Sequence, residues 1–563
     1  MTATTESPPT RADAEPTGAT AESRWTPERE AVAVALIVFV ATLLLTVNER
    51  LLIGSFNDDG VYVAVGKAIA AGEGYRSIHL AGDPVQVKYP PGYPALLAVL
   101  WWIGGSLPNV AGLIRLLNTA VVAAGAGTLW YYGRRVLGAH VLPLALLGIG
   151  PFFLDATLQY HSLALTEPYF VLGWAICLLV VAREIDSTNA SLAPRVAAWG
   201  GITLAVTTLF RAHAVALIPA VLLALVHRRS GTRAILAFTA GAIVPLVAWQ
   251  VYHGYMIAHG RVSSIPDEAS YVDWFTSGDV ADTYRAVWST AIRNVGGYAS
   301  ILTDYTSGIR QLAAAILAFA AVVVGIGAYR TRRGRPELVL MIGASLVLVL
   351  IWPFLQDRFL LPLLPFMGLL AARAISDFVR ARPPIVYRLV VVAMIGVVPM
   401  IALRQVELRA EGRRRAEAGL APEVFGPAYF LPSITRYLET VTVWVRDHTT
   451  PEDRILVEFP AAVYHYTGRK ASNSNPSVPF GGESVFAHPG DYLARRILED
   501  DVTILSISGP TLMIYRDAAI LSARCPHVLE LVEGHPQVRF PLFFRIHRDD
   551  ACLRERVIDA VGS

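Results

Sequence analysis

Cysteine is scarce in this sequence, with only Cys177, Cys525 and Cys552 among 563 residues. None of the three has the spacing of a metal site, so the sequence does not indicate structural zinc. A disulfide between Cys525 and Cys552, in a domain outside the cell, and two buried thiols are both consistent with the sequence.

Charged residues are also few, at 17% of the chain, and the formal net charge is only +3. The basic residues lie between apolar segments instead of forming one patch, which argues against nucleic acid as a partner. A glycine-rich nucleotide fingerprint is absent as well, and its absence argues against a soluble nucleotide-sugar site.

Apolar residues, in contrast, are abundant. They make up 54% of the chain, and the mean hydropathy is +0.46. This composition is typical of a chain that needs lipid, so we expect a polytopic α-helical membrane protein.

Three regions follow one another along the chain. Residues 1–30 have no apolar periodicity and are predicted to be a disordered tail. Residues 31–403 are predicted to form the multi-span domain, and residues 404–563 a separate small domain. The apolar runs predict about eleven spans, at residues 31–47, 110–132, 139–155, 167–183, 196–210, 212–227, 233–252, 310–329, 337–354, 357–376 and 386–403.

The arginines predict how these spans are oriented. Arginine-rich connectors fall on alternate sides of the span count, so all of them reach one face, which the positive-inside rule makes cytoplasmic. The N-terminus is then cytoplasmic in a plasma-membrane protein, and residues 54–109, 156–166, 253–309 and everything after 403 lie outside.

Three segments complicate this topology. Residues 93–105 are apolar but too short to cross a bilayer, so we expect an interfacial helix. Residues 196–227 carry Arg211 and His213 in the middle, which fits two short spans or a re-entrant hairpin, and both return the chain to the same side. The arginines at 409–415 follow the last span on the outer face, against the simple rule, but they head a long domain, where the rule is weak.

Alternating helix and strand patterns predict that residues 404–563 form a small extracytoplasmic α/β domain. Helices are expected at 433–448 and 491–500, and strands at 454–459, 502–508, 528–532 and 538–548. The stretch 464–469 is rich in groups that contact sugars, but a turn between strand and helix is the simpler interpretation.

The longest polar interruption directly after the first apolar run is residues 54–94. Its specific residues are, in order, Asp58-Asp59-x-x-Tyr62, Gly74-Tyr75 and Lys88-Tyr89-Pro90-Pro91-Gly92-Tyr93. This order resembles the first external loop of the GT-C membrane glycosyltransferases, in particular the branch of protein O-mannosyltransferases and the lipid A aminoarabinose transferase.

The resemblance implies a GT-C fold with the catalytic residues in the external loop 54–109. It also implies a glycosyltransferase that takes a sugar from a polyprenyl-phosphate carrier outside the membrane. The expected partners are the polyprenyl-phosphate-linked sugar, membrane lipids and a hydroxyl of a cell-envelope lipid, glycan or protein. No soluble cofactor is required, and a divalent metal is compatible with this chemistry.

Transfer to a hydroxyl needs a base that takes its proton. Asp58 is the candidate base. Asp59 is expected to raise the proton affinity of Asp58, to orient the acceptor or to bind a divalent cation. The alternative is structural, because both acids stand where a helix N-terminus is stabilised by such residues.

Glu167 lies at the mouth of a span in the second external loop. Glu167-Pro168 resembles the acid-proline pair of the aminoarabinose transferase, with glutamate in place of aspartate. We therefore expect Glu167 to support catalysis through metal binding or acceptor orientation, with His161 as a further candidate ligand. The alternative is that Glu167 only stabilises the start of the following helix.

Three cations are expected to hold the donor phosphate, namely Lys88, Arg211 and Arg358. Lys88 lies in the segment that resembles the family's phosphate-contacting loop. Arg358 begins an arginine-aromatic-leucine-leucine-proline sequence that resembles the start of a late span in the family. The alternatives are an ion pair between Arg358 and Asp357, and a snorkelling side chain for Arg211.

Two other functions compete with the transferase. A transporter or flippase of a lipid-linked saccharide would place ionisable residues near mid-bilayer and show internal repeats, whereas the acids here gather at one face and no repeat is found. A membrane scaffold or sensor would tolerate Asp58→Asn without losing activity.

Overall fold

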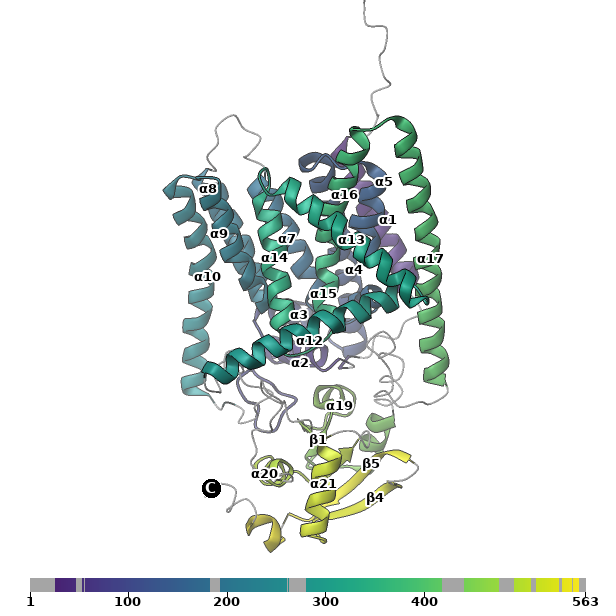
Figure 1. The fold of residues 1–563 in the computed structure, drawn as a ribbon. Helices are drawn as coiled ribbons and strands as arrows, with labels where there is room; N and C mark the ends of the chain where they lie inside the picture. Colours follow the sequence, from purple (N-terminus) through teal and green to yellow (C-terminus); the bar gives the residue numbers. More distant parts are fainter. Residues whose placement is uncertain are drawn as a thin grey trace, which may run out of the picture.

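The computed structural model describes residues 26–46, 53–54, 56–182, 193–260, 262, 280–417, 440–474, 491–507, 513–535, 539–548 and 550–555. A bundle of long helices carries a small sheet domain at one end (Figure 1). Residues 1–25 of the predicted tail and residues 433–439 of a predicted helix lie outside the described residues.

Every apolar run that predicts a span is helical in the structure. The elements of the bundle are α1 (Pro27–Thr46), α2 (Asp58–Ala70), α3 (Gly92–Gly104), α4 (Leu107–Tyr131), η1 (Tyr132–Val136), α5 (Val141–Pro143), η2 (Leu144–Ile149), η3 (Gly150–Phe153), α6 (Asp155–Ser162), α7 (Glu167–Ala182), α8 (Pro194–Phe210), η4 (Ala212–Ala216), α9 (Leu217–His227), α10 (Thr232–His259), α12 (Val280–Thr306), α13 (Arg310–Thr331), α14 (Pro336–Ile351), α15 (Asp357–Leu360), η6 (Leu361–Leu363), α16 (Leu364–Arg380) and α17 (Pro384–Glu417).

Six helices among the described residues are long and apolar enough to cross a membrane, and the bent pair 141–153 and 155–161 would make a seventh. The other expected spans are shorter helices such as α7 and α14, each of 16 residues, which stand beside the long ones (Figure 1). At about 1.5 Å per residue such helices fall short of a core of about 30 Å. The count of eleven spans therefore stays a prediction.

The helices pack along their lengths. α1 packs on α4, α8 on both α7 and α10, and α13 on α16. The break between α8 and η4 leaves Arg211 with an extended backbone, at φ −145° and ψ 113°, between two helical segments. The stretch 196–227 is thus two consecutive helical pieces joined at this residue.

α12 lies across the end of the bundle near the sheet domain instead of running along it (Figure 1). One side of α12 exposes a stripe of apolar side chains at helical spacing, Tyr284, Trp288, Ile292 and Val295. Its other side holds the buried Asn294, whose side chain donates to the carbonyl groups of Leu350 and Trp352 at the end of α14. α12 therefore has the amphipathic pattern of a helix at a lipid–water interface.

The C-terminal sheet has five strands in the order β2-β1-β3-β5-β4. Its elements are β1 (Ile455–Val457), α19 (Pro460–Thr467), β2 (Ala471–Asn473), α20 (Asp491–Glu499), β3 (Ile504–Ile507), α21 (Met513–Arg524), β4 (Leu529–His535) and β5 (Arg539–Ile546), preceded by a helix at 440–448. β1 is parallel to β2 and β3, and β5 is antiparallel to β3 and β4.

Alternating side chains of the strands bury both faces of this sheet. Leu456 and Leu505 pack with residues of α20 and α21 on one face. Ile455, Val457 and Ile504 pack with α19 and the helix at 440–448 on the other. The expectation of a small α/β domain is confirmed, although α19 replaces the turn expected at 464–469, and β2 and α21 were not predicted.

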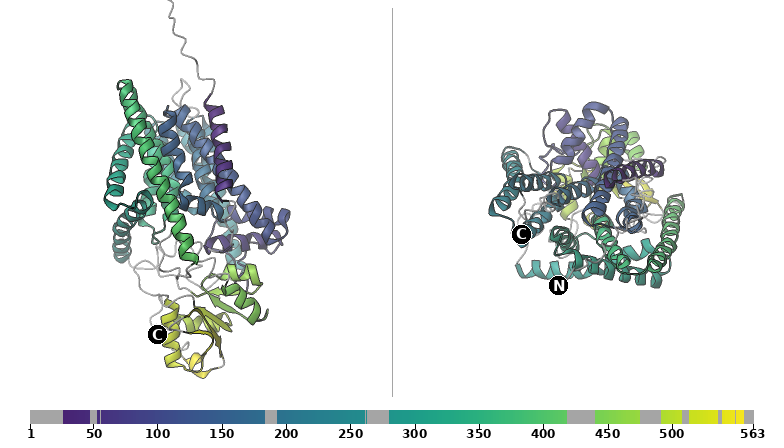
Figure 2. Two further views of the ribbon diagram at one scale, coloured as in Figure 1. Left: turned by 90° about the vertical axis from the view of Figure 1, so that its right-hand side faces the viewer. Right: turned by 90° about the horizontal axis from the view of Figure 1, so that it is seen from above.

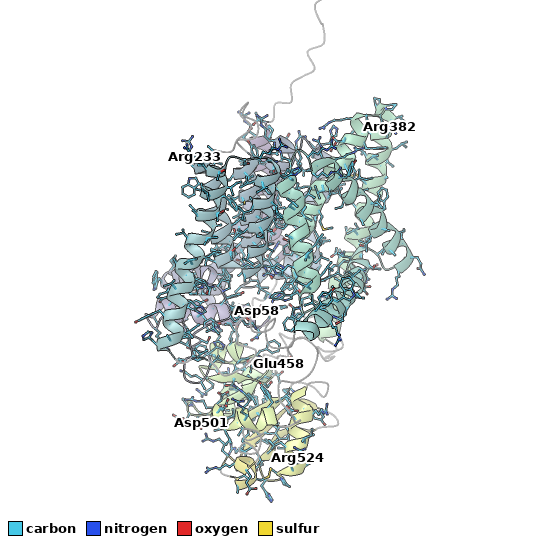
Figure 3. The ribbon with its side chains drawn as sticks, turned by 60° about the vertical axis from the view of Figure 1, so that its left-hand side comes forward. Asp58, Arg233, Arg382, Glu458, Asp501 and Arg524 are labelled. Atoms are coloured by element: carbon cyan, nitrogen blue, oxygen red, sulfur yellow. A yellow bond between two sulfur atoms is a disulfide. The ribbon has the colours of Figure 1, made fainter. Side chains whose placement is uncertain are left out.

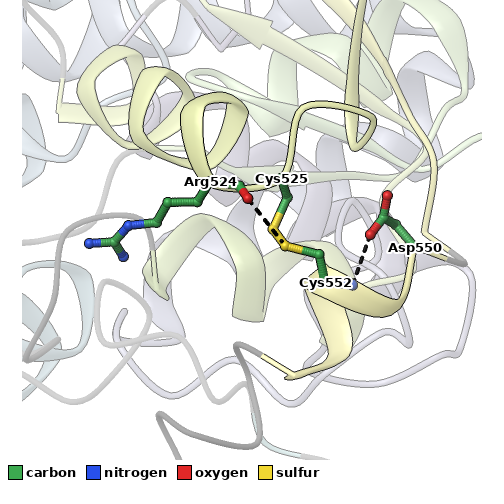
Figure 4. The surroundings of a disulfide bond; sticks show 4 residues. All are labelled: Arg524, Cys525, Asp550 and Cys552. Atoms are coloured by element: carbon green, nitrogen blue, oxygen red, sulfur yellow. Dashed lines mark hydrogen bonds between the residues drawn. A yellow bond between two sulfur atoms is a disulfide. The ribbon is translucent and has the colours of Figure 1, made fainter.

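Cys525 and Cys552 form a disulfide with a Cα–Cα distance of 5.8 Å, which decides between the two alternatives that the sequence left open (Figure 4). The bond ties the end of α21 to the last described helical turn of the chain. Cys177 is a free, buried cysteine in α7.

Labelled residues show which connectors lie at which end of the bundle. Arg233 and Arg382 lie at the end that points away from the sheet domain, whereas Asp58 lies between the bundle and the domain (Figure 3). A view turned by 90° shows the sheet domain beyond one end of the helices (Figure 2). These two arginines, predicted to face the cytoplasm, thus lie at the end opposite Asp58.

Candidate active site

Asp58 begins α2, and two side chains from distant parts of the chain hold its carboxylate. The Tyr89 hydroxyl donates to Oδ1 at 2.5 Å, and Nη2 of Arg358 donates to Oδ2 at 2.5 Å. Burial alone would raise the pKa of Asp58, but the charges of Arg358 and Lys88 and the hydrogen bond from Tyr89 outweigh it and lower the pKa. Asp58 is therefore a carboxylate at neutral pH.

Close packing against the sheet domain fixes the position of this carboxylate. Gly54 has φ +92°, and a Cβ there would lie 2.6 Å from Cβ of Ala462 in α19. A Cβ on Gly60 would lie 2.8 Å from Cβ of Ala461. Only glycine permits this approach, so the start of α2 rests directly on α19.

Four polar contacts also join the loop to the sheet domain. The backbone N–H of Ile53 donates to the Tyr466 hydroxyl at 2.8 Å, and Nε2 of His465 contacts the Gly60 carbonyl at 2.9 Å. The remaining two are an ion pair of 2.5 Å between Lys470 and Asp83, and a backbone hydrogen bond of 2.9 Å from Ala471 to His79. Residues 465–471 thus hold the domain against the loop.

Asp59 has a different environment from Asp58. Its side chain is fully buried, and its two oxygens accept the backbone N–H groups of Gly54 at 2.8 Å and Phe56 at 2.9 Å. Burial raises the pKa of Asp59 to about 7, although these hydrogen bonds favour the charged form. The charge of Asp58 also raises the pKa of Asp59, whereas Arg358, Lys88 and Tyr89 lower the pKa of Asp58 overall, so Asp59 is the acid of the pair with the raised pKa. Asp59 holds the turn that presents Asp58.

Glu167 begins α7 and faces two arginines. Oε1 of Glu167 lies 2.8 Å from Nη1 of Arg211 and 3.9 Å from Nε of Arg358. Arg211 also donates to the Thr166 hydroxyl at 3.0 Å. Arg211 therefore pairs inside the protein instead of snorkelling, and Arg358 lies between the carboxylates of Asp58 and Glu167.

Asp357 does not pair with the side chain of Arg358, so that alternative is wrong. Its oxygens accept hydrogen bonds from the hydroxyls of Tyr160, at 2.5 Å, and Tyr305. The guanidinium of Arg358 instead stacks 4.4 Å from the ring centre of Phe56. These contacts leave Arg358 directed towards Asp58.

A small pocket opens beside this cluster on the side of the bundle. Glu167, Arg358, His161 and Tyr160 supply its polar lining, and Phe152, Val171 and Leu361 belong to its apolar lining. Within the described residues no group of three or more His, Cys, Asp or Glu side chains is arranged to hold a metal ion. His161 and Glu167 line one pocket, but Asp59 uses both oxygens on backbone groups, so the residues considered for a metal do not form a site.

A second pocket lies between the loop and the sheet domain. Asn57, Lys88 and Tyr89 line it from the loop, and Pro460 and Asn473 line it from the domain. The charge of Lys88, like that of Arg358, acts on Asp58. The six residues expected to carry the chemistry all lie in or beside the Asp58 cluster.

The architecture matches solved structures over nearly its whole length. ArnT from Cupriavidus metallidurans bound to undecaprenyl phosphate aligns with a TM-score of 0.53 and 14% identity over 93% of this chain and 98% of that chain. The apo state of that ArnT aligns with a TM-score of 0.51 and 14% identity over 92% and 97%. The chain has the GT-C fold.

A weaker match is the apo form of the oligosaccharyltransferase of Archaeoglobus fulgidus, with a TM-score of 0.48 and 12% identity over 85% of this chain and 69% of that chain. No protein-family model matches the chain, and no curated protein matches its sequence.

Several residues of the Asp58 cluster and its surroundings were not predicted as site residues. Tyr89 stands in the motif that carries the resemblance, but nothing in the sequence relates its hydroxyl to Asp58. Tyr160 and Tyr305 reach Asp357 across separations of 197 and 52 residues, which no local pattern reveals. His79 has no signal other than its place in the loop.

Proposed function

We propose that this protein is a membrane glycosyltransferase that moves a sugar from a polyprenyl-phosphate donor to a hydroxyl of a cell-envelope acceptor. One observation carries the proposal. In a GT-C fold, the Asp58 carboxylate is held by a buried arginine that lines one pocket and by a tyrosine hydroxyl whose residue lines another.

The reaction is a single displacement. The acceptor oxygen forms a bond to the anomeric carbon of the sugar while the bond from that carbon to the phosphate oxygen breaks. Asp58 takes the proton of the acceptor hydroxyl, and the electron pair of the broken bond stays on the polyprenyl phosphate. The lowered pKa of Asp58 keeps it in the basic form that this step needs.

Cations are required because the phosphate gains a negative charge when the bond to the sugar breaks. Arg358 and Arg211 lie around Glu167, and the charge of Lys88 also acts on Asp58. We assign the leaving phosphate to Arg358 and Arg211, with Lys88 as a third cation. Arg358 offers two nitrogens on one rigid fork, which suits a phosphate.

The choice of donor rests on the structural neighbour. The ArnT that aligns over 93% of this chain was solved with undecaprenyl phosphate bound. The apolar bundle of the present chain lies next to the Asp58 cluster, so a lipid carrier can stay among the helices while its phosphate reaches the arginines. We extend the lipid-phosphate donor to this chain on that basis.

The orientation of the chain follows from two features. A disulfide persists in oxidising compartments outside the cytoplasm, and Cys525–Cys552 lies in the sheet domain. Arg233 and Arg382 lie at the opposite end of the bundle, as the positive-inside rule requires of a cytoplasmic face (Figure 3). We therefore place the site and the sheet domain outside the plasma membrane and the N-terminus inside.

The test uses membranes that contain the full-length protein and a panel of radiolabelled polyprenyl-phosphate sugars. We expect the wild type to release label from one of these lipids and Asp58→Asn to release almost none. Asp501→Asn is the matched control, because Asp501 is an exposed acid of the sheet domain, paired with Arg548. If no lipid loses its label, or if Asp58→Asn releases label as fast as the control, the proposal is wrong.

A further inference from the structure

The pocket between the loop and the sheet domain is lined mainly by uncharged polar groups. They are Asn57, Ser77, His79, Gln86, Tyr89 and Asn473. Lys88 is the one charged residue of the lining, and no carboxylate belongs to it. Amides, an imidazole and hydroxyls are groups that donate and accept hydrogen bonds without demanding a charged ligand.

Two atoms of this lining have no hydrogen-bond partner among the described residues. They are Nδ1 of His79 and Oδ1 of Asn57, and both are shielded from solvent. The His79 residue is 2% exposed. A buried polar atom without a hydrogen-bond partner costs free energy. A ligand that forms hydrogen bonds with these two atoms would therefore bind favourably in this pocket.

His79 is neutral in this position. Burial first, and then the neighbouring His465, lower its pKa to about 3. A neutral imidazole has one donor nitrogen and one acceptor nitrogen, and a hydroxyl group can satisfy either.

The rest of the lining is fixed in place. Gln86 donates from Nε2 to the Ser77 hydroxyl at 3.0 Å, and its Oε1 accepts the backbone N–H of Lys88 at 2.8 Å. The backbone N–H of Ala471, two residues before Asn473, donates to the His79 carbonyl at 2.9 Å. The pocket is therefore a preformed feature in which the sheet domain supplies one wall.

The pocket also reaches the proposed base. Tyr89 lines it and donates to Oδ1 of Asp58 at 2.5 Å, and Asn57 directly precedes Asp58. The arginine that we assign to the donor phosphate lines the other pocket. Donor and acceptor would then occupy separate pockets near Asp58, so that the acceptor hydroxyl can meet the anomeric carbon on the face opposite the leaving phosphate.

We propose that this pocket binds hydroxyl groups of the acceptor, that the acceptor is a sugar, and that His79 and Asn473 select it. The cavity of about 20 Å³ has room for about one hydroxyl group, so the pocket takes a hydroxyl of the acceptor sugar while the rest of the glycan or glycolipid headgroup stays outside. The inference rests on the proposed transferase function and adds the class of acceptor to it.

The experiment supplies the full-length protein in membranes with the donor that it consumes and a panel of methyl glycosides as probe acceptors. The measured quantity is the ratio of sugar transferred to the glycoside to sugar released to water. We expect His79→Leu and Asn473→Leu each to lower this ratio about tenfold, as the loss of one buried hydrogen bond implies. His79→Gln keeps a polar side chain and should restore part of the ratio, and His547→Leu, an exposed histidine of the sheet domain, is the matched control.

Binding is measured separately by hydrogen exchange. A bound glycoside should slow exchange at residues 77–86 and 471–473 in the wild type and less in His79→Leu. If the wild type releases donor label with Asp58 dependence but the ratio and the exchange are the same in all variants, the pocket holds only water and this inference is wrong. If there is no Asp58-dependent release at all, the transferase proposal itself fails.

Discussion

Replacing Arg358 separates its electrostatic role from a merely structural one. The side chains of Arg358 and Asp58 are 10% and 17% exposed, so water screens their 2.5 Å ion pair only weakly. Removing one partner of such a buried pair costs about 3–5 kcal/mol. If the transition state loses about 3–4 kcal/mol of this, Arg358→Gln lowers kcat/KM by about 10²–10³-fold.

The pH dependence of the transfer rate provides a second, independent test of the role of Arg358. In the wild type, burial favours protonation of Asp58, and Arg358 is the largest of the groups that oppose it and lower its pKa. Arg358→Gln leaves the burial in place and removes that opposition, so the pKa of Asp58 rises. Asp58 then takes up its proton at higher pH, and the acid side of the rate profile should move to higher pH.

The assay is the initial rate of label transfer in membranes, followed from acidic to mildly alkaline pH. Arg358→Lys keeps the charge but loses the fork that faces Asp58 and Glu167 and the stacking on Phe56, so we expect an intermediate rate. Arg382→Gln, at the opposite end of the bundle, is the control (Figure 3). If Arg358→Gln has the wild-type rate and the acid side of its pH–rate profile does not shift, Arg358 does not have the electrostatic role assigned to it.

Three further predictions concern the support of the site. The folded wild type takes up a proton at Asp59 as pH falls below about 7, because the pKa of Asp59 is raised in the folded state, and this uptake adds thermal stability. Asp59→Asn should abolish this gain. Melting curves measured over a series of pH values check this. Gly60→Ala should lower transfer at least tenfold, because its Cβ would lie 2.8 Å from Cβ of Ala461 and 2.8 Å from Cα of Gly54. Ala461→Gly in the same chain relieves only the first contact, so it should leave most of the loss in place. Cys525→Ser or Cys552→Ser removes a bond that spans 27 residues, so the sheet domain should lose about 3–4 kcal/mol and become more sensitive to protease, whereas equal digestion of both forms would contradict this.

The helices of the bundle were the most predictable part of the fold. An apolar run needs a helix in lipid, so the run at 310–329 is enough to predict α13, which spans Arg310–Thr331. The sheet domain was harder to predict, because short elements leave weak patterns. β2 has three residues and α19 has eight, and neither gives a period that stands out from a turn.

α21 is a different case, because its signal was present. Its positions Ile514, Ala518 and Leu521, together with Cys525 just after it, follow one another in the sequence at helical spacing, and all four are buried in the structure. Such spacing marks one face of a helix, so the sequence pattern was sufficient to predict α21.

The candidate site also has a part that the sequence predicts and a part that it does not. The motif around Asp58 and Lys88 supplied the residues of the loop, but the partner of each side chain depends on tertiary contacts. Arg358 is 300 residues from Asp58, and the sequence offered Asp357, its neighbour, as an equal partner. The two tyrosines that satisfy Asp357 are the reason that Arg358 turns to the loop instead.

α12 sets the depth of the reaction centre. Its stripe of Tyr284, Trp288, Ile292 and Val295 matches the side chains that anchor a helix among lipid headgroups, and its buried side is bonded to the end of α14, six residues before Arg358. A helix at that level would keep the end of the bundle that carries Arg358 near the lipid headgroups. Under the proposed function, a carrier lipid that diffuses within the leaflet would then reach the arginines without leaving it, so the search for substrate would take place in two dimensions.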